Sequence, residues 1–161
     1  MLKLTMIEFF LRAIPEEFLL IFAIHAFSKT SINMKKYMTS SILLVITIYL
    51  IRLLPIQFGI HTILGLIVCI ILTVNINKIG IIKSIQASII TMILEFICEG
   101  INIFIIEYVF KADVSYVLSE PSLKILSGIP SLIIFATIVF IYYFRLLRKK
   151  ELKEVSNGEI S

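Results

Sequence analysis

Long apolar stretches alternate with short polar segments along the 161-residue chain. A helix needs about 20 mostly apolar residues to cross a bilayer, and five stretches approach or exceed that length. They cover residues 6–27, 37–56, 59–76, 79–110 and 125–147. Because only helices and closed barrels satisfy their backbone in lipid, this pattern predicts an all-α protein, a polytopic membrane bundle with about five transmembrane helices.

The first stretch is the least regular, since it carries charged residues and a proline. Pro15 followed by Glu16 and Glu17 is typical of a helix start, which would leave residues 15–27 too short to cross alone. The other interpretation is one helix over residues 6–27 that is kinked at Pro15. We favour that helix because a crossing here makes every later loop obey the positive-inside rule. A four-crossing bundle with an interfacial first helix is the alternative.

The positions of the cations indicate an orientation. They gather before the second stretch, at the start of the fourth and after the fifth: Lys29, Lys35, Lys36, Lys78, Lys83, Arg145, Arg148, Lys149, Lys150 and Lys153. With five crossings these clusters share one side, which the positive-inside rule makes cytoplasmic. The sequence thus predicts a multi-pass protein of the cell membrane, with its N-terminus outside and its C-terminus inside. Residues 1–147 form the bundle and residues 148–161 a short charged cytoplasmic tail.

Composition agrees with a lipid environment. Hydrophobic residues make up 59% of the chain and charged residues 16%, whereas soluble domains are roughly 45–50% apolar. The net charge is +4, but most cations flank apolar stretches, so we expect contact with the lipid bilayer and none with nucleic acid. Cys69 and Cys98 fall inside apolar stretches, which is not the pattern of a secreted disulfide framework.

A polar stripe runs along the fourth stretch. Its members recur at steps of three and four: Ser84, Ser88, Thr91, Glu95, Glu99 and Asn102. That spacing puts them on one helix face, which should point into the bundle because the other residues are mostly apolar. An ionised carboxylate at the bilayer centre costs about 2.5–3.5 kcal/mol. Glu95 and Glu99 therefore need a proton, water or an opposite charge.

The five-crossing topology offers partners for these carboxyl groups at mid-bilayer and in the outer half of the bundle. The predicted cluster consists of Arg12, Glu16, Arg52, His61, Glu95, Glu99 and Asn102. One hypothesis is an outward-facing polar cavity that binds a charged or peptide-like ligand. The other is a set of buried ion pairs that fixes the register of the helices.

No catalytic group, metal site or cofactor is predicted. His61 and Cys69 could pair as base and nucleophile, but eight residues on a straight helix separate them by about 12 Å along the axis and about 80° around it. The 2 histidines lie on different stretches and the cysteines lack CxxC spacing, so no metal site is recognisable. We expect a protein that is not an enzyme.

Three short segments carry a family resemblance: residues 12–17 (RAIPEE), 51–55 (IRLLP) and 145–150 (RLLRKK). With them, the whole chain resembles the N-terminal transmembrane sensor module of Agr-type receptor histidine kinases and related small stand-alone membrane proteins of Gram-positive bacteria. The resemblance implies a module that meets a peptide signal outside and passes it through the last helix to a cytoplasmic kinase. No histidine-phosphotransfer helix or ATP-binding domain follows Lys150, so we expect any output to need a partner.

The function expected from the sequence is a non-enzymatic sensory or regulatory membrane module. It would bind an extracellular signal in the polar cavity and act through a partner, such as a membrane histidine kinase. The alternative is a small transporter component, such as the substrate-binding subunit of a vitamin importer. Those subunits resemble this chain in size and hydrophobicity but usually have six helices.

Overall fold

The computed structural model describes residues 12–54, 59–109, 111 and 121–152, and this part of the chain contains helices and no strand. The elements are α2 (Ile14–Phe27), α3 (Met34–Leu53), α4 (Ile60–Asn75), α5 (Ile81–Phe104), the short π-helix η2 (Ile105–Val109) and α7 (Pro121–Arg148). Each predicted apolar stretch contains one α-helix, so the all-α prediction is confirmed. The predicted tail, residues 148–161, falls mostly outside the described residues.

Two helices begin earlier than the apolar pattern predicts, because of the residue types at their N-termini. α3 starts at Met34 because the side chain of Asn33 accepts a hydrogen bond from the backbone N–H of Lys36 at 3.4 Å, which satisfies a free donor of the first turn. α7 starts at Pro121, a residue type that suits the first helical position. An apolar stretch predicts the part of a helix that lies in lipid. Residues at the N-terminus of the helix can extend it before the apolar stretch begins.

The chain around Pro15 is helical on both sides of the proline. α2 begins at Ile14 with Pro15 in its first turn, and Arg12 and Ala13 form a π-helical turn before it. A π-turn beside a proline is a recognised cause of a helix bend. The described residues therefore fit both interpretations, since α2 has 14 residues and starts beside Pro15, while helical backbone at Arg12 and Ala13 precedes it. The earlier part of the predicted stretch, before Arg12, lies outside the described residues.

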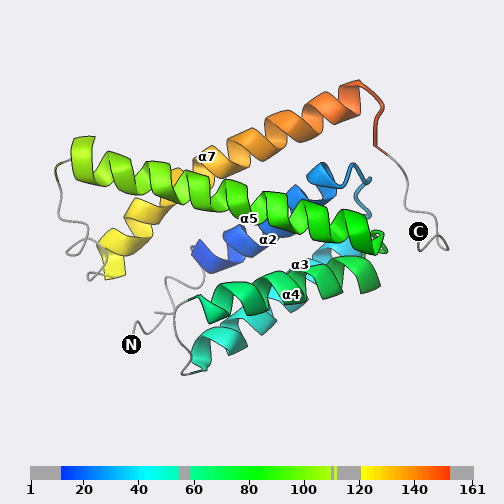
Figure 1. Cartoon of the computed structure of the whole chain (residues 1–161), viewed down its shortest axis with the longest axis horizontal. Helices are drawn as coiled ribbons and strands as arrows, with labels where there is room; N and C mark the ends of the chain where they lie inside the picture. Colours follow the sequence, from blue (N-terminus) through cyan, green and yellow to red (C-terminus); the bar gives the residue numbers. More distant parts are fainter. Residues whose placement is uncertain (1–11, 55–58, 110, 112–120, 153–161) are drawn as a thin grey trace.

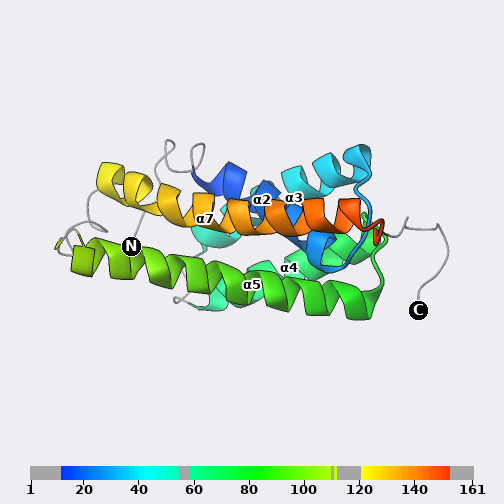
Figure 2. The same cartoon turned by 90° about the horizontal axis from the view of Figure 1, so that it is seen from above.

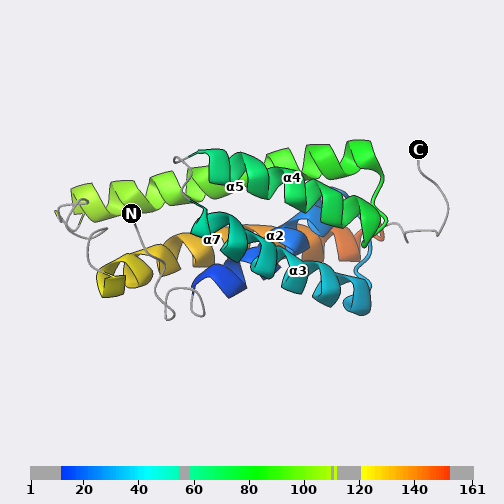
Figure 3. The same ribbon diagram turned by 90° about the horizontal axis from the view of Figure 1, so that it is seen from below.

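The helices lie roughly along one long axis and alternate in direction (Figure 1). Figures 2 and 3 show two layers, one formed by α7, α2 and α3 and the other by α5 and α4. α2 contacts each of the other four α-helices. It is the central element of the bundle.

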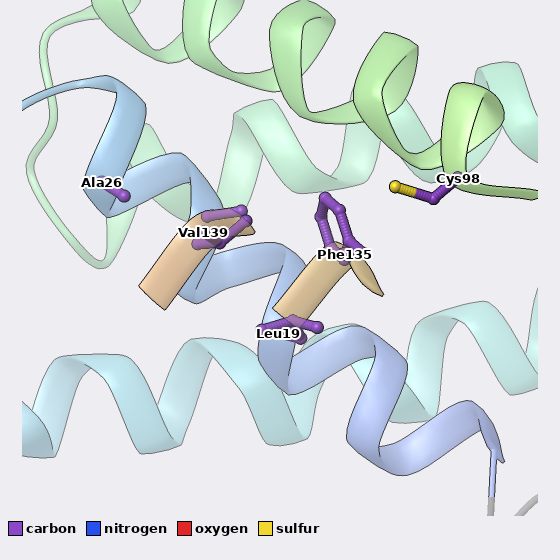
Figure 4. Close-up of a cluster of buried hydrophobic side chains, with 6 residues drawn as sticks. Leu19, Ala26, Cys98, Phe135 and Val139 are labelled. Carbon is purple, nitrogen blue, oxygen red and sulfur yellow. The ribbon is translucent and has the colours of Figure 1, made fainter. Parts of the chain in front are cut away.

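Two apolar clusters hold the layers together. The first contains Leu19 and Ala26 of α2, Cys98 of α5, and Phe135 and Val139 of α7 (Figure 4). The second joins α2 to α3, α4 and α5 through Ile21, Ile24, Leu44, Cys69, Ile79 and Ala87. Both clusters include α2, so its packing links every part of the core.

Large apolar side chains cover the outside of the bundle, whereas many buried positions are small or carry a hydroxyl group. Buried hydroxyl side chains include Ser40, Ser41, Thr73, Ser84, Ser88 and Thr91. Small and hydroxyl-bearing residues at helix contacts are typical of bundles in lipid. Within the residues that the structure describes, three helices are long and apolar enough to cross a membrane: Met34–Leu53, Ile81–Val109 and Leu126–Arg148. The structure thus fits a membrane protein.

Polar contacts tie together the end of the bundle where α2 leads into α3 and α4 into α5. Asn77 donates to Ser40 at 3.0 Å, and the hydroxyl groups of Thr73 and Ser84 are hydrogen-bonded. The segments with the cation clusters, residues 28–36, 76–83 and 145–150, lie at this same end (Figure 1).

Candidate functional site

The half of the bundle away from these cations contains a cavity of about 570 Å³. All seven residues of the predicted cluster line it: Arg12, Glu16, Arg52, His61, Glu95, Glu99 and Asn102. They come from the start of α2, the end of α3, the start of α4 and the second half of α5. Ligand cavities typically measure about 300–1,000 Å³, so this volume suits a small molecule.

The polar stripe of α5 forms one wall of the cavity. Five of its six members, Ser88, Thr91, Glu95, Glu99 and Asn102, are among the lining residues. Ser84 lies beyond the cavity, where its hydroxyl group bonds to Thr73. The stripe therefore points into the bundle, as the spacing predicts, and most of its length borders the cavity.

Arg12 contacts two carboxyl groups, one on α2 and one on α5. Its Nη2 lies 3.1 Å from Oε1 of Glu99, and its Nε lies 3.8 Å from Oε2 of Glu16. Gly128 of α7 makes room for the guanidinium, since a Cβ atom at Gly128 would come within 2.9 Å of Arg12 Cζ. Three helices thus converge on Arg12.

Arg52 lies at the cavity without a close carboxylate. Among the residues that the structure describes, it has no ion pair within 4.0 Å. Of the two arginines in the predicted cluster, Arg12 is therefore the one that contacts Glu99 in this part of the chain. Glu95 instead lies beside Glu16 of α2, a helix that packs against α5.

Asn102 and His61 lie towards the end of the cavity where α4 and α7 begin. The side chain of Asn102 donates to the backbone carbonyl of Ser127 at 2.6 Å, which ties α5 to α7. His61 is half-buried in the first turn of α4. Both residues occupy the predicted half of the bundle.

Glu17 is a charged lining residue that the sequence did not predict. It is only 4% exposed, and its Oε2 has no hydrogen-bond partner in the described part of the chain. Arg12 and Glu16 are four residues apart, so they share one helix face. Glu17 lies off that face, but α2 is surrounded by other helices, so a second face also reaches the cavity. The adjacent carboxyl groups of Glu16 and Glu17 favour a place away from lipid, but no signal in the sequence shows that α2 contacts all the other described α-helices.

The composition of the wall limits what the cavity can do chemically. It brings together four carboxyl groups, those of Glu16, Glu17, Glu95 and Glu99, and two guanidinium groups, with apolar side chains between them. No group of three or more His, Cys, Asp or Glu side chains in the described chain could hold a metal ion. The arrangement suits binding of a charged ligand.

A double-mutant cycle should detect the contact between Arg12 and Glu99. Both side chains are partly exposed, at 23% and 39%, so we expect a coupling of about 1 kcal/mol, between the values for surface and buried pairs. The measurement is the free energy of unfolding in detergent for Arg12→Gln, Glu99→Gln and the double variant. Arg52→Gln combined with Glu99→Gln is the control and should couple by less than about 0.5 kcal/mol. Equal coupling in the two cycles would contradict the geometry.

Two glycine substitutions test the close approach of α7 to Arg12. An alanine at Gly128 would displace the guanidinium, whereas a Cβ atom at Gly100 meets nothing within 4 Å. Both changes gain about 0.5–1 kcal/mol of helix propensity, so Gly100→Ala should raise the melting temperature in detergent. Gly128→Ala should melt below Gly100→Ala, because it also weakens the ion pairs of Arg12. In an Arg12→Gln background that difference should disappear, and its persistence would mean that Gly128 accommodates something other than Arg12.

Comparisons with protein-family models, with curated proteins and with solved structures find no match to this chain. The interpretation of the cavity therefore rests on its residues and their geometry.

Proposed function

We propose that this protein is a non-enzymatic sensory or regulatory membrane module that binds an extracellular signal in the cavity and acts through a partner. The observation that carries the proposal is the cavity itself, about 570 Å³ in volume and lined by charged side chains of α2, α3 and α5 and by Arg12 just before α2. Ion pairing alone does not need such a space, since helices can close around a paired arginine and carboxylate. A cavity of this size, with polar and charged groups placed among apolar side chains, suits a ligand site.

The topology in this proposal has five crossings, with the N-terminus outside and the C-terminus inside. It is supported by the alternating direction of the helices and by the cation clusters at one end of the bundle (Figure 1). α4 has 16 residues, about 24 Å long, so the bilayer must thin around it or its flanking residues must reach the interface. In this orientation the cavity lies in the outer half of the membrane.

α7 is the element through which binding would reach the cytoplasm. Ser127, Gly128 and Ser131 line the cavity, and Pro130 interrupts the helix at the same place. Proline removes a backbone hydrogen bond and lets a helix bend. A ligand that bends α7 at Pro130 would move the other end of this helix, which is 28 residues long. A partner such as a membrane histidine kinase would detect that movement.

Cysteine labelling tests the proposed orientation. In a background with Cys69 and Cys98 replaced by alanine, Lys111→Cys should react with an impermeant thiol reagent added to intact cells. Lys35→Cys should react only after the membrane is opened, because it lies at the cation-rich end. Labelling of Lys35→Cys from outside would overturn the orientation.

Site-specific crosslinking in native membranes tests the sensory function. A photoreactive amino acid at Arg148, on the exposed cytoplasmic end of α7, should capture a histidine kinase. The same amino acid at Lys111, beyond the other end of α5, is the control and should not. Capture of an ATP-hydrolysing transport subunit would instead favour a transporter component. Capture of neither class would count against a partner-dependent output.

A further inference from the structure

We propose that the cavity binds an organic cation, a protonated amine on an apolar body, with its positive charge held by Glu17 and Glu95. This inference rests on the proposed function, because it names the ligand class of the same cavity.

The balance of charges favours a cation over an anion. Four carboxyl groups and two guanidinium groups line the cavity, and the guanidinium of Arg12 is already engaged by Glu99 and Glu16. An anion would have to displace those carboxylates or approach Arg52 against the remaining acidic groups. A cation meets an excess of acceptors.

Two buried acceptor groups at the cavity have no donor within the described residues. Oε2 of Glu17 belongs to a side chain that is 4% exposed, and Oγ of Ser88 to one that is 2% exposed. They come from different helices, α2 and α5, and both line the cavity. Buried polar groups are nearly always paired, so these atoms indicate a hydrogen-bond donor that the described residues do not supply. An ammonium group carries several donors and the required charge.

Glu16 and Glu95 come from different helices, α2 and α5, and their carboxyl groups lie close enough to repel each other when both are ionised. A bound cation beside Glu95 relieves that repulsion.

The remaining wall matches an apolar ligand body. Between the carboxyl groups the cavity is lined by half-buried aliphatic and thioether side chains, Leu20, Ile48, Leu66 and Met92. Contact between this wall and a hydrocarbon ligand body stabilises the complex, whereas an inorganic cation would leave the wall uncovered. The predicted ligand is thus amphipathic.

Three probes of one shape but different charge test the ligand class. Phenylbutylamine is a cation at neutral pH, as lysine is, phenylbutanol is neutral and phenylbutyrate is an anion. Binding to the purified full-length protein in nanodiscs of zwitterionic lipid is measured by calorimetry, with empty nanodiscs subtracted. We expect the amine to bind at least about tenfold more tightly than either analogue, as for a charge-assisted hydrogen bond. Equal binding of the three probes, preference for the anion, or no binding of the amine would overturn the proposal.

Matched variants test the place of the charge. Glu17→Gln and Glu95→Gln should each weaken amine binding by about tenfold, while Glu151→Gln, an acid outside the cavity, should leave it unchanged. Each variant is first melted in detergent, and if one fails to fold, the other decides. A folded variant with unchanged affinity would contradict the assignment of that residue. Partner capture at Arg148 is independent of these probes, so failure of the ligand class and failure of the sensory function are distinguishable.

Discussion

Carboxyl groups cannot face hydrocarbon, and this constraint puts the helix that carries Glu16 and Glu17 at the centre of the bundle. α2 contacts every other α-helix in the described chain and contributes to both apolar clusters. The surrounding helices expose large apolar side chains, which lipid tolerates well. The polar helix lies inside because burying an ionisable group among other helices, where it finds partners, is less costly than exposing it to lipid.

The interior combines close packing at one end with a cavity at the other. Towards the cation-rich end, short polar side chains such as Ser40 and Asn77 let the backbones approach and satisfy one another. Such contacts are typical of helix association in membranes. Towards the other end, long charged side chains replace them, and Arg12, Glu16 and Glu99 cannot pack as densely as serine or alanine. The position of the cavity follows from this change in side-chain size.

The two interpretations of the polar cluster each describe a different part of it. Arg12 with Glu99 and Glu16 forms the ion pairs of the structural interpretation, and these pairs link α2 to α5. Glu17, Glu95 and Ser88 line space that no other described side chain fills, which is what the ligand interpretation requires. The ion pairs fix the position of the cavity wall, and Oε2 of Glu17 and Oγ of Ser88, which have no partner among the described residues, remain able to bind a ligand.

Much of this architecture could be predicted from the sequence, because spacing along one helix decides which residues share a face. The apolar stretches predict the helices, and the steps of three and four from Ser84 to Asn102 predict the inward stripe of α5. Contacts between helices could not be predicted in the same way, since they depend on which elements become neighbours. Only the tertiary structure decided four features: α2 is central, Glu95 lies beside Glu16 and not Arg52, Glu17 reaches the cavity, and Gly128 leaves room for Arg12. The physical reason is that helical periodicity fixes directions around one axis, whereas a contact also requires the position and rotation of a second axis.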